Sequence, residues 1–257
     1  MLTEIKKLNC SFADFSDNYV IIGGTACNIH EELNAQTPRA TKDLDIVLII
    51  EALSTEFVAK FWEFIVSGQY GDKNRGEGIE SHQEYYRFKR PLNSDYPYQI
   101  ELFARNIGLI NFPDEAHITP IPTDEDLSSL SAILMDDEYY NYTISHSQVI
   151  DGVHIADIDS LICLKARAYV DLILRKEQGE NVDSRNIEKH KKDVLRLVAM
   201  QPDDNIVLPD SLKEHLLEFS DLIATNLPDQ NFIKSIGLPP SFTPSQLLMQ
   251  LKKNFNL

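Results

Sequence analysis

The segment DLDIVLII, residues 43–50, places five apolar residues in a row directly after two aspartates. The run from Ile46 to Ile50 is far too short to cross a membrane. Its Val and Ile content is typical of a strand that is buried on both faces. Side chains alternate along a strand with period two, so Asp43 and Asp45 point to the same side. The segment therefore predicts a central strand that carries two carboxylates on one face.

A glycine turn lies upstream of these aspartates. Gly23, Gly24 and Thr25 stand in YVIIGGTA, between a predicted buried strand from Tyr19 to Ile22 and a predicted helix from Thr25 to Leu33. The first backbone N–H groups of a helix bind phosphate readily, and the Thr25 hydroxyl would add to them. Taken alone, the same residues also fit an ordinary turn from a strand to a helix.

A third acid occurs on a later predicted strand, Tyr98 to Phe103. Glu101 alternates there with Gln99 and Phe103, so these three side chains share one face. Mg²⁺ prefers carboxylate, phosphate and water oxygens as ligands, and Mn²⁺ is the alternative ion. Asp43, Asp45 and Glu101 are therefore the predicted metal ligands. Glu101 could instead be a non-ligand in a degenerate site.

The remaining pattern predicts an α/β (α+β) fold, with a mixed sheet flanked by helices and then a helical domain. The predicted domains are 1–156 and 157–257, because the hydrophobic period becomes helical from Ile158. Predicted strands cover 84–89, 118–122, 139–144 and 149–155. Predicted helices follow Ser54 up to Phe64, Asp157 or Asp159 up to about Gly179, and Asp183 or Ser184 up to Ala199, and cover 211–224 and 245–254.

The combination GGTA and R-A-T-K-D-L-D resembles the DNA polymerase β-like nucleotidyltransferase superfamily, and it is closest to the AbiEii/AbiGii toxin family of type IV toxin–antitoxin systems. The resemblance is strong over 19–50, fair over 99–105 and 158–197, and absent from the last third of the helical half. It implies a Mg²⁺-dependent enzyme that transfers an NMP from an NTP to an acceptor hydroxyl of an RNA, such as tRNA, or of a protein. It also implies a toxin that is neutralised by an antitoxin protein.

The resemblance further implies roles for residues outside the acid trio. Lys165 would contact the triphosphate, and Asp193 would position the acceptor or act as a base. Sequence context offers simpler roles: Lys165 lies in an apolar helical stripe and could extend to the domain edge, and Asp193 has Lys189 one helical turn before it. Thr41 could bind phosphate or stabilise its loop. The implied nucleotide-binding residues are Gly23, Gly24, Thr25, Arg39 and Thr41.

The net charge of −16 bears on the acceptor. Proteins that bind nucleic acid usually carry a basic surface, because phosphate contacts dominate their affinity. The best basic candidate here is 185–196, although a solvated helix face is the simpler interpretation and is favoured over it. A cationic small molecule of the antibiotic type is the alternative acceptor, since an acidic protein attracts it. A third interpretation is a degenerate protein that binds a nucleotide or a partner without turnover.

The cysteines show neither metal-binding nor redox spacing. Three cysteines are present, and an odd number argues against a disulfide framework. Cys27 and Cys163 fall among apolar neighbours in predicted helices, which predicts buried free thiols. No apolar segment follows Lys6 and Lys7, so no signal peptide is expected and a cytoplasmic location is predicted.

Overall fold

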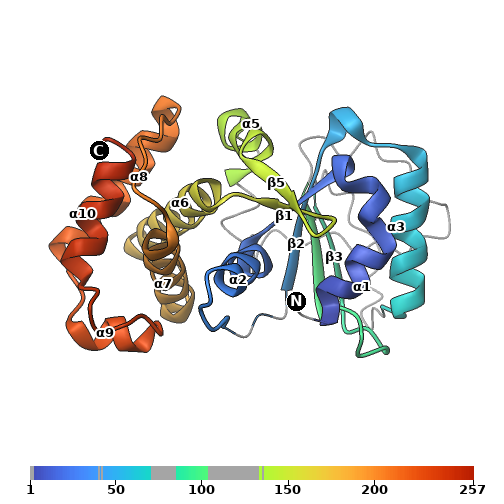
Figure 1. Cartoon of the computed structure of the whole chain (residues 1–257), viewed down its shortest axis with the longest axis horizontal. Coiled ribbons are helices and arrows are strands. Elements are labelled where there is room, and N and C mark those ends of the chain that lie inside the picture. Colours follow the sequence, from blue (N-terminus) through green and yellow to red (C-terminus); the bar gives the residue numbers. More distant parts are fainter. Residues whose placement is uncertain (1–2, 40, 42, 71–84, 104–132, 135) are drawn as a thin grey trace. The chain divides into compact units, whose positions relative to one another are not determined.

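The computed structural model describes residues 3–39, 41, 43–70, 85–103, 133–134 and 136–257 (Figure 1). The fold is mixed α/β. The chain divides into two compact units that interleave along the sequence. The first contains the described residues of Met1–Ala26, Ala40–Met135 and Ser147–Ala156, and the second contains those of Cys27–Arg39, Asp136–His146 and Asp157–Leu257. The predicted boundary at 156/157 coincides with one of these divisions, and the domain assignment otherwise stays a prediction.

The first unit is built on one mixed sheet, whose described strands follow the order β3-β4-β2-β1-β6-β5. β1 is antiparallel to β2 and parallel to β6, and β2 is parallel to β4. The pairs β3–β4 and β5–β6 are antiparallel. The bounds are β1 Tyr19–Ile22, β2 Asp43–Leu48, β3 Tyr85–Lys89, β4 Gln99–Phe103, β5 Ser147–Ile150 and β6 Val153–Ala156. As predicted from its apolar run, β2 is buried from Leu44 to Leu48.

Helices α1 (Thr3–Phe12) and α3 (Thr55–Gly68) pack side by side against this sheet (Figure 1). The Ser54 hydroxyl caps α3 by accepting the N–H of Phe57, as its sequence position predicted. The ring of Phe12 lies 5.2–6.2 Å from the rings of Tyr19, Phe57, Phe61 and Phe64. Two short 3₁₀ helices, Ala13–Asn18 and Ile50–Ala52, complete the described part of this unit.

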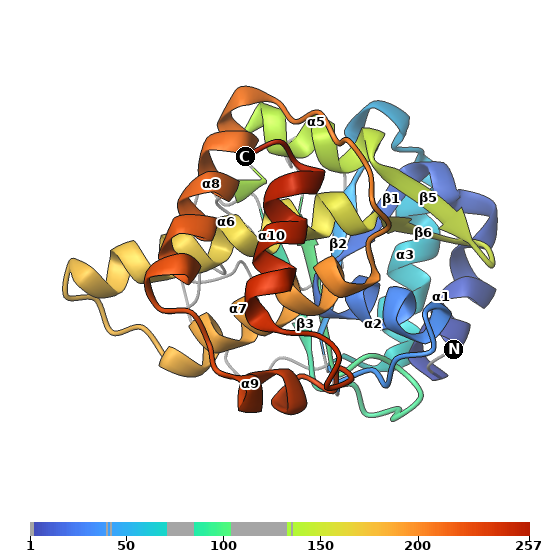
Figure 2. The same cartoon turned by 60° about the vertical axis from the view of Figure 1, so that its left-hand side comes forward.

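The second unit is helical. It contains α5 (Asp137–Ser145), α6 (Ile158–Glu177), α7 (Ser184–Met200), α8 (Asp210–Thr225), α9 (Gln230–Ser235) and α10 (Pro244–Asn254) (Figure 2). It also includes most of α2 (Gly23–Leu33), from Cys27 onward. Long helices were predicted close to α6, α7, α8 and α10, whereas the short α9 was not predicted. No helix in the described ranges is long and apolar enough to cross a membrane.

Two strand predictions need correction. Residues 139–144 form part of α5, because the Asp136 carboxylate caps a helix there and the buried tyrosines follow a helical spacing. Residues 149–155 do not form one strand. Asp151 and Gly152, with φ of 50° and 80°, make a tight turn between β5 and β6, which is the turn an Asp-Gly pair favours. The strand predicted at 118–122 lies outside the described residues.

Candidate functional site

The predicted acids meet on one face of the sheet in the first unit. In the parallel pair β2–β4, Asp43 lies opposite Gln99 and Asp45 opposite Glu101. Since side chains alternate along both strands, these four residues share a face. Asp45 and Glu101 are buried, with exposed fractions of 8% and 5%. The register thus unites a motif near residue 45 with an acid that lies more than fifty residues further along the chain.

Gly23 makes room for Asp45. Ile22 pairs with Asp45 across β1 and β2, so the glycine that follows Ile22 approaches the Asp45 carboxylate. A Cβ atom on Gly23 would lie 1.8 Å from Asp45 Oδ2 and 3.0 Å from Asp45 Cβ. Gly23 also has a φ of +68°, which disfavours other residues. The glycine turn and the acid pair, recognised as separate motifs, are therefore in direct contact.

Thr25 ties the start of α2 to the same strand. Its hydroxyl donates a hydrogen bond of 2.9 Å to the carbonyl oxygen of Asp43, and its side chain is buried. Gly24 lies in the first turn of α2 and is also buried. The role of Thr25 in the structure is thus to hold the acid strand, while its expected phosphate contact stays a prediction. Thr41 is half-buried just before β2.

Glu101 is bound by two side chains from the sheet. Arg87 Nε on β3 and Gln99 Nε2 on β4 each donate a 2.7 Å hydrogen bond to Glu101 Oε1. Burial, followed by the charge of Asp45, raises the pKa of Glu101 to about 7, and Asp43 contributes in the same direction. Arg87 acts against this rise. Negative charge on this face is therefore only partly compensated by the neighbouring cation.

The donor chemistry of this face suits a hard divalent cation. Carboxylate oxygens are ligands that Mg²⁺ and Mn²⁺ prefer, and a cation would offset the burial and the charge of Asp45 that raise the pKa of Glu101. Among the described residues, no three His, Cys, Asp or Glu side chains stand together in an arrangement that could hold a metal ion. The chemistry of the three carboxylates suits such an ion, but the described structure does not gather them around one point, and Glu101 is bound to Arg87 and Gln99.

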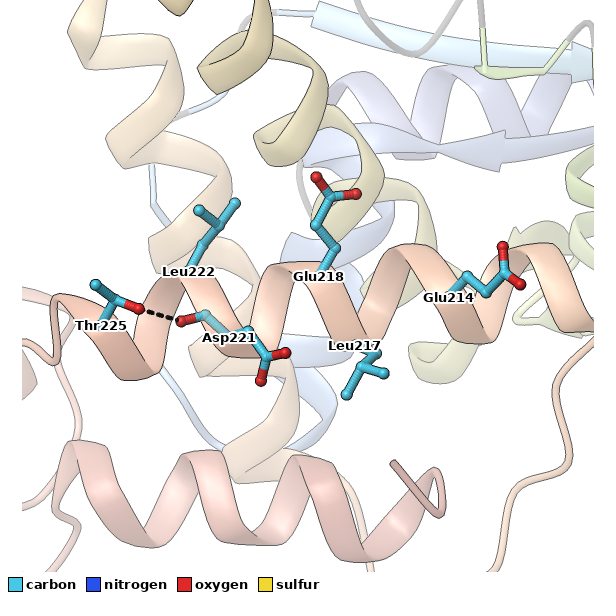
Figure 3. A pocket seen from close by; sticks show the side chains of 6 residues that line it. All are labelled: Glu214, Leu217, Glu218, Asp221, Leu222 and Thr225. Atoms are coloured by element: carbon cyan, nitrogen blue, oxygen red, sulfur yellow. Dashed lines mark hydrogen bonds between the residues drawn. The ribbon is translucent and has the colours of Figure 1, made fainter.

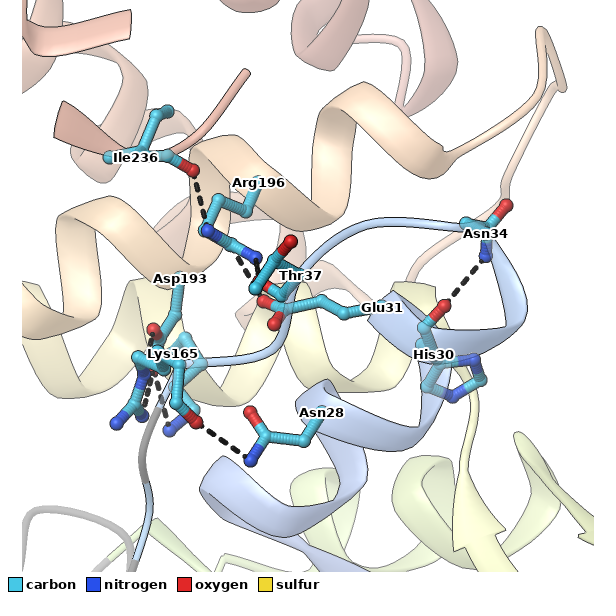
Figure 4. Close-up of polar contacts among 10 residues, drawn as sticks. Asn28, His30, Glu31, Asn34, Thr37, Lys165, Asp193, Arg196 and Ile236 are labelled. Atoms are coloured by element: carbon cyan, nitrogen blue, oxygen red, sulfur yellow. Dashed lines mark hydrogen bonds and ion pairs between the residues drawn. The ribbon is translucent and has the colours of Figure 1, made fainter. Parts of the chain in front are cut away.

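Three other predicted residues, Arg39, Lys165 and Asp193, form a cluster within the second unit. Arg39 binds both carboxylate oxygens of Asp193, through Nε at 2.8 Å and Nη2 at 2.9 Å. Lys165 Nζ lies 3.2 Å from Asp193 Oδ2 (Figure 4). Lys165 and Asp193 are almost fully buried, so Asp193 is not on a solvated helix face and Lys165 does not reach to solvent. Burial raises the pKa of Asp193, but Lys165 and Arg39 outweigh it and lower the pKa to about 2.

A second arginine from α7 organises the segment after α2. Arg196 donates to Glu31 Oε1 at 2.7 Å, to the carbonyl of Thr37 at 2.7 Å and to the carbonyl of Ile236 at 2.5 Å (Figure 4). Asn28 Nδ2 donates to the carbonyl of Arg39 at 3.0 Å. Sequence analysis identified Arg196 only as part of a basic stretch, and because Arg196 is buried it does not contribute to a basic surface. No local signal indicates that Glu31 would be its partner.

His190 on α7 lies close to the same charges. Its ring is partly covered, yet its Nδ1 atom is buried and makes no hydrogen bond within the described residues. Burial lowers the pKa of His190 to about 3, and the charge of Lys165 lowers it as well. His190 is therefore neutral in the native protein at neutral pH.

Both predicted buried thiols are confirmed. Cys27 and Cys163 are buried and free. Burial raises the pKa of the Cys27 thiol to about 12, so that it is neutral and unreactive at neutral pH.

A shallow depression on α8 is lined by none of the predicted site residues. Its lining residues all come from this helix and are Glu214, Leu217, Glu218, Asp221, Leu222 and Thr225 (Figure 3). Asp221 pairs with Lys252 of α10 at 3.2 Å. These are side chains of a solvated helix face.

Comparisons with protein-family models, with curated proteins and with solved structures find no match to this chain.

Replacing Gly23 by Ala is expected to destabilise the first unit by at least about 2 kcal/mol more than replacing Gly152 by Ala. Both glycines have positive φ, but the Cβ at Gly152 would meet only the tip of Asn9, which can move. Trp62 on α3 reports unfolding of this unit by fluorescence in urea. Equal losses for the two variants would show that Asp45 does not need the space at Gly23.

His190 is expected to make the second unit sensitive to acid. Its folded pKa is lowered, so the unfolded chain binds the extra proton between about pH 6.5 and 3, and stability falls as pH falls through that window. His190→Gln should remove up to about 1.4 kcal/mol per pH unit of that slope. Hydrogen exchange of α7 amides between pH 6.5 and 4.5 measures it. Parallel curves for wild type and variant would contradict the assignment.

Proposed function

We propose that this protein is a Mg²⁺-dependent nucleotidyltransferase that transfers an NMP from an NTP to an acceptor hydroxyl. The observation that carries the proposal is the register of β2 with β4, which sets Asp43, Asp45 and Glu101 on one sheet face with the glycine turn against Asp45. In the reaction, the acceptor oxygen bonds to the α-phosphorus while the bond to the β-phosphate oxygen breaks, and pyrophosphate leaves. The nucleotidyltransferase arrangement of the sheet is part of this proposal.

Each residue of the acid face has a role in it. Asp43, Asp45 and Glu101 would hold the divalent ion, which when bound would stabilise charge on the phosphoryl oxygens. The backbone N–H groups of Gly23 and Gly24 at the start of α2 would bind the phosphates. Thr25 would keep that helix start next to the acid strand through its bond to Asp43.

The cluster around Asp193 supports a different role from general base. A general base works best with a pKa near the operating pH, whereas the pKa of Asp193 is about 2 and both its oxygens are bound. Asp193 is better suited to hold Lys165 and Arg39. The resemblance assigns Lys165 to the triphosphate, and Arg39 and Thr41 to the nucleotide; these contacts stay expectations of the resemblance, while in this structure Lys165 and Arg39 are bound to Asp193.

The acceptor is proposed to be a protein or an RNA. The basic stretch on α7 has fewer cationic side chains available to bind RNA than its composition suggested. Arg196 is buried against Glu31, and Arg185, although exposed, is paired with Asp183. A cationic small molecule stays an alternative, since the net charge of −16 favours it.

A binding-only protein is the second candidate function. The observation that favours it is that Arg87 and Gln99 already bind one oxygen of Glu101, so this acid has partners within the sheet without any ion. Such a protein would bind a nucleotide or a partner without transferring anything.

Nucleotidyl transfer is expected with one α-³²P-labelled NTP, Mg²⁺ and a mixture of total RNA and protein, and Asp45→Asn should lower it by about 100-fold or more. Asp95→Asn is the matched control, because Asp95 is an exposed aspartate of the same unit. Label in RNA or in protein identifies the acceptor class. A labelled small molecule would favour the antibiotic type, and absence of label with all four NTPs would favour the binding-only protein.

A toxin role predicts that induced expression arrests bacterial growth, and that Asp45→Asn restores growth at equal protein levels. Asp95→Asn should remain toxic. A separately encoded antitoxin should restore growth when it is co-expressed. Normal growth with the wild-type protein, at levels confirmed by blotting, would remove the toxin role without affecting the proposed chemistry.

A further inference from the structure

We infer that Arg87 and Gln99 are positioning residues that orient Glu101 toward the divalent ion of the proposed function, on which this inference rests. Arg87 lies directly opposite Glu101 in the antiparallel pair β3–β4. Gln99 stands two residues before Glu101 on the same strand and the same face. Each contributes one donor to the carboxylate.

The two hydrogen bonds converge on a single oxygen. Arg87 Nε and Gln99 Nε2 both bind Glu101 Oε1 at 2.7 Å, and within the described residues no hydrogen bond or ion pair ends on Oε2. Arg87 and Glu101 have side-chain exposures of 11% and 6%, so the pair is held in a largely dry environment. The carboxylate is therefore fixed through one oxygen, and the other oxygen is left for a ligand.

A glutamate needs such an anchor more than an aspartate does. Its side chain has one more rotatable bond, so a free Glu would spread its carboxylate over more positions and lose more entropy on binding an ion. Second-shell hydrogen bonds that orient a metal ligand typically change metal affinity by about 10- to 100-fold. Arg87 and Gln99 would hold the longer Glu101 side chain in a single position, so that it can act as a metal ligand where an aspartate would need fewer orienting hydrogen bonds.

Arg87 also carries a charge, and its two possible effects on cation binding have opposite signs. As a mere counter-charge, Arg87 would repel the ion, so removing it would strengthen binding. As an anchor, it presents the carboxylate, so removing it would weaken binding. The sign of the change in affinity therefore separates the two roles.

The test measures Mn²⁺ binding to the full chain from the electron paramagnetic resonance signal of free Mn²⁺. Arg87→Met is expected to weaken binding by about 10-fold or more, although it makes the face more negative. Gln99→Leu should also weaken binding, and it changes no charge. Lys89→Met is the matched control: Lys89 lies two residues further on β3 on the same face, is exposed, and pairs with Gln99 in the register. It should leave binding unchanged or slightly tighter.

Failure of this inference and failure of the proposed function give different results. If the wild-type protein binds no Mn²⁺, or Asp45→Asn binds it equally well, the metal site itself is wrong. If the wild type binds and Asp45→Asn does not, while Arg87→Met and Gln99→Leu bind as tightly as Lys89→Met, the positioning role alone is overturned. Trp62 fluorescence shows that each variant is folded, and Gln99→Leu decides the matter if Arg87→Met is not.

Discussion

The first unit depends on how three carboxylates are accommodated on one face of a buried sheet. Burial and then the negative charges of Asp45 and Asp43 raise the pKa of Glu101, because like charges repel more strongly away from water. Four neighbouring strands each contribute to accommodating these charges. The glycine after β1 gives Asp45 room, β2 and β4 carry the acids, and Arg87 on β3 binds Glu101. Such an arrangement is costly for stability alone, and perturbed acids of this kind gather at functional sites.

The second unit handles buried charge in the opposite way. Asp193 is bound by two cations, and Arg196, three residues later on α7, binds a carboxylate and two carbonyls. Buried ions are tolerated when their hydrogen bonds are satisfied, as both oxygens of Asp193 are, whereas Oε2 of Glu31 has no hydrogen-bond partner within the described residues. Together these bonds hold residues 31–39 to the helices of this unit. That segment lies between the glycine turn and the acid pair in the sequence, and within the second unit α7 holds it in place.

Sequence patterns correctly predicted the features that depend on neighbouring residues alone. The apolar run of β2, the cap at Ser54 and the long helices follow from periodicity and capping, and period two put Asp43 and Asp45 on one side. The partners of these residues could not be derived in this way. Arg39 and Asp193 are 154 positions apart, and nothing near either residue indicates the other. A strand was predicted at residues 139–144 because tyrosine and threonine favour strands. These residues form a helix instead, because the N-terminal cap and burial along one side of the helix override that preference.

The charge of the protein bears differently on the proposed chemistry and on the choice of acceptor. The acid face needs a cation locally, and the net charge of −16 does not oppose that. The same net charge does oppose binding of a polyanionic acceptor. Because Arg196 is buried, the predicted basic stretch at 185–196 also has one fewer cation at the surface. An RNA acceptor would have to be bound through few basic contacts, with weak dependence on salt. A protein acceptor faces no such demand, because a polar surface of mixed charge can meet an acidic enzyme through local complementarity.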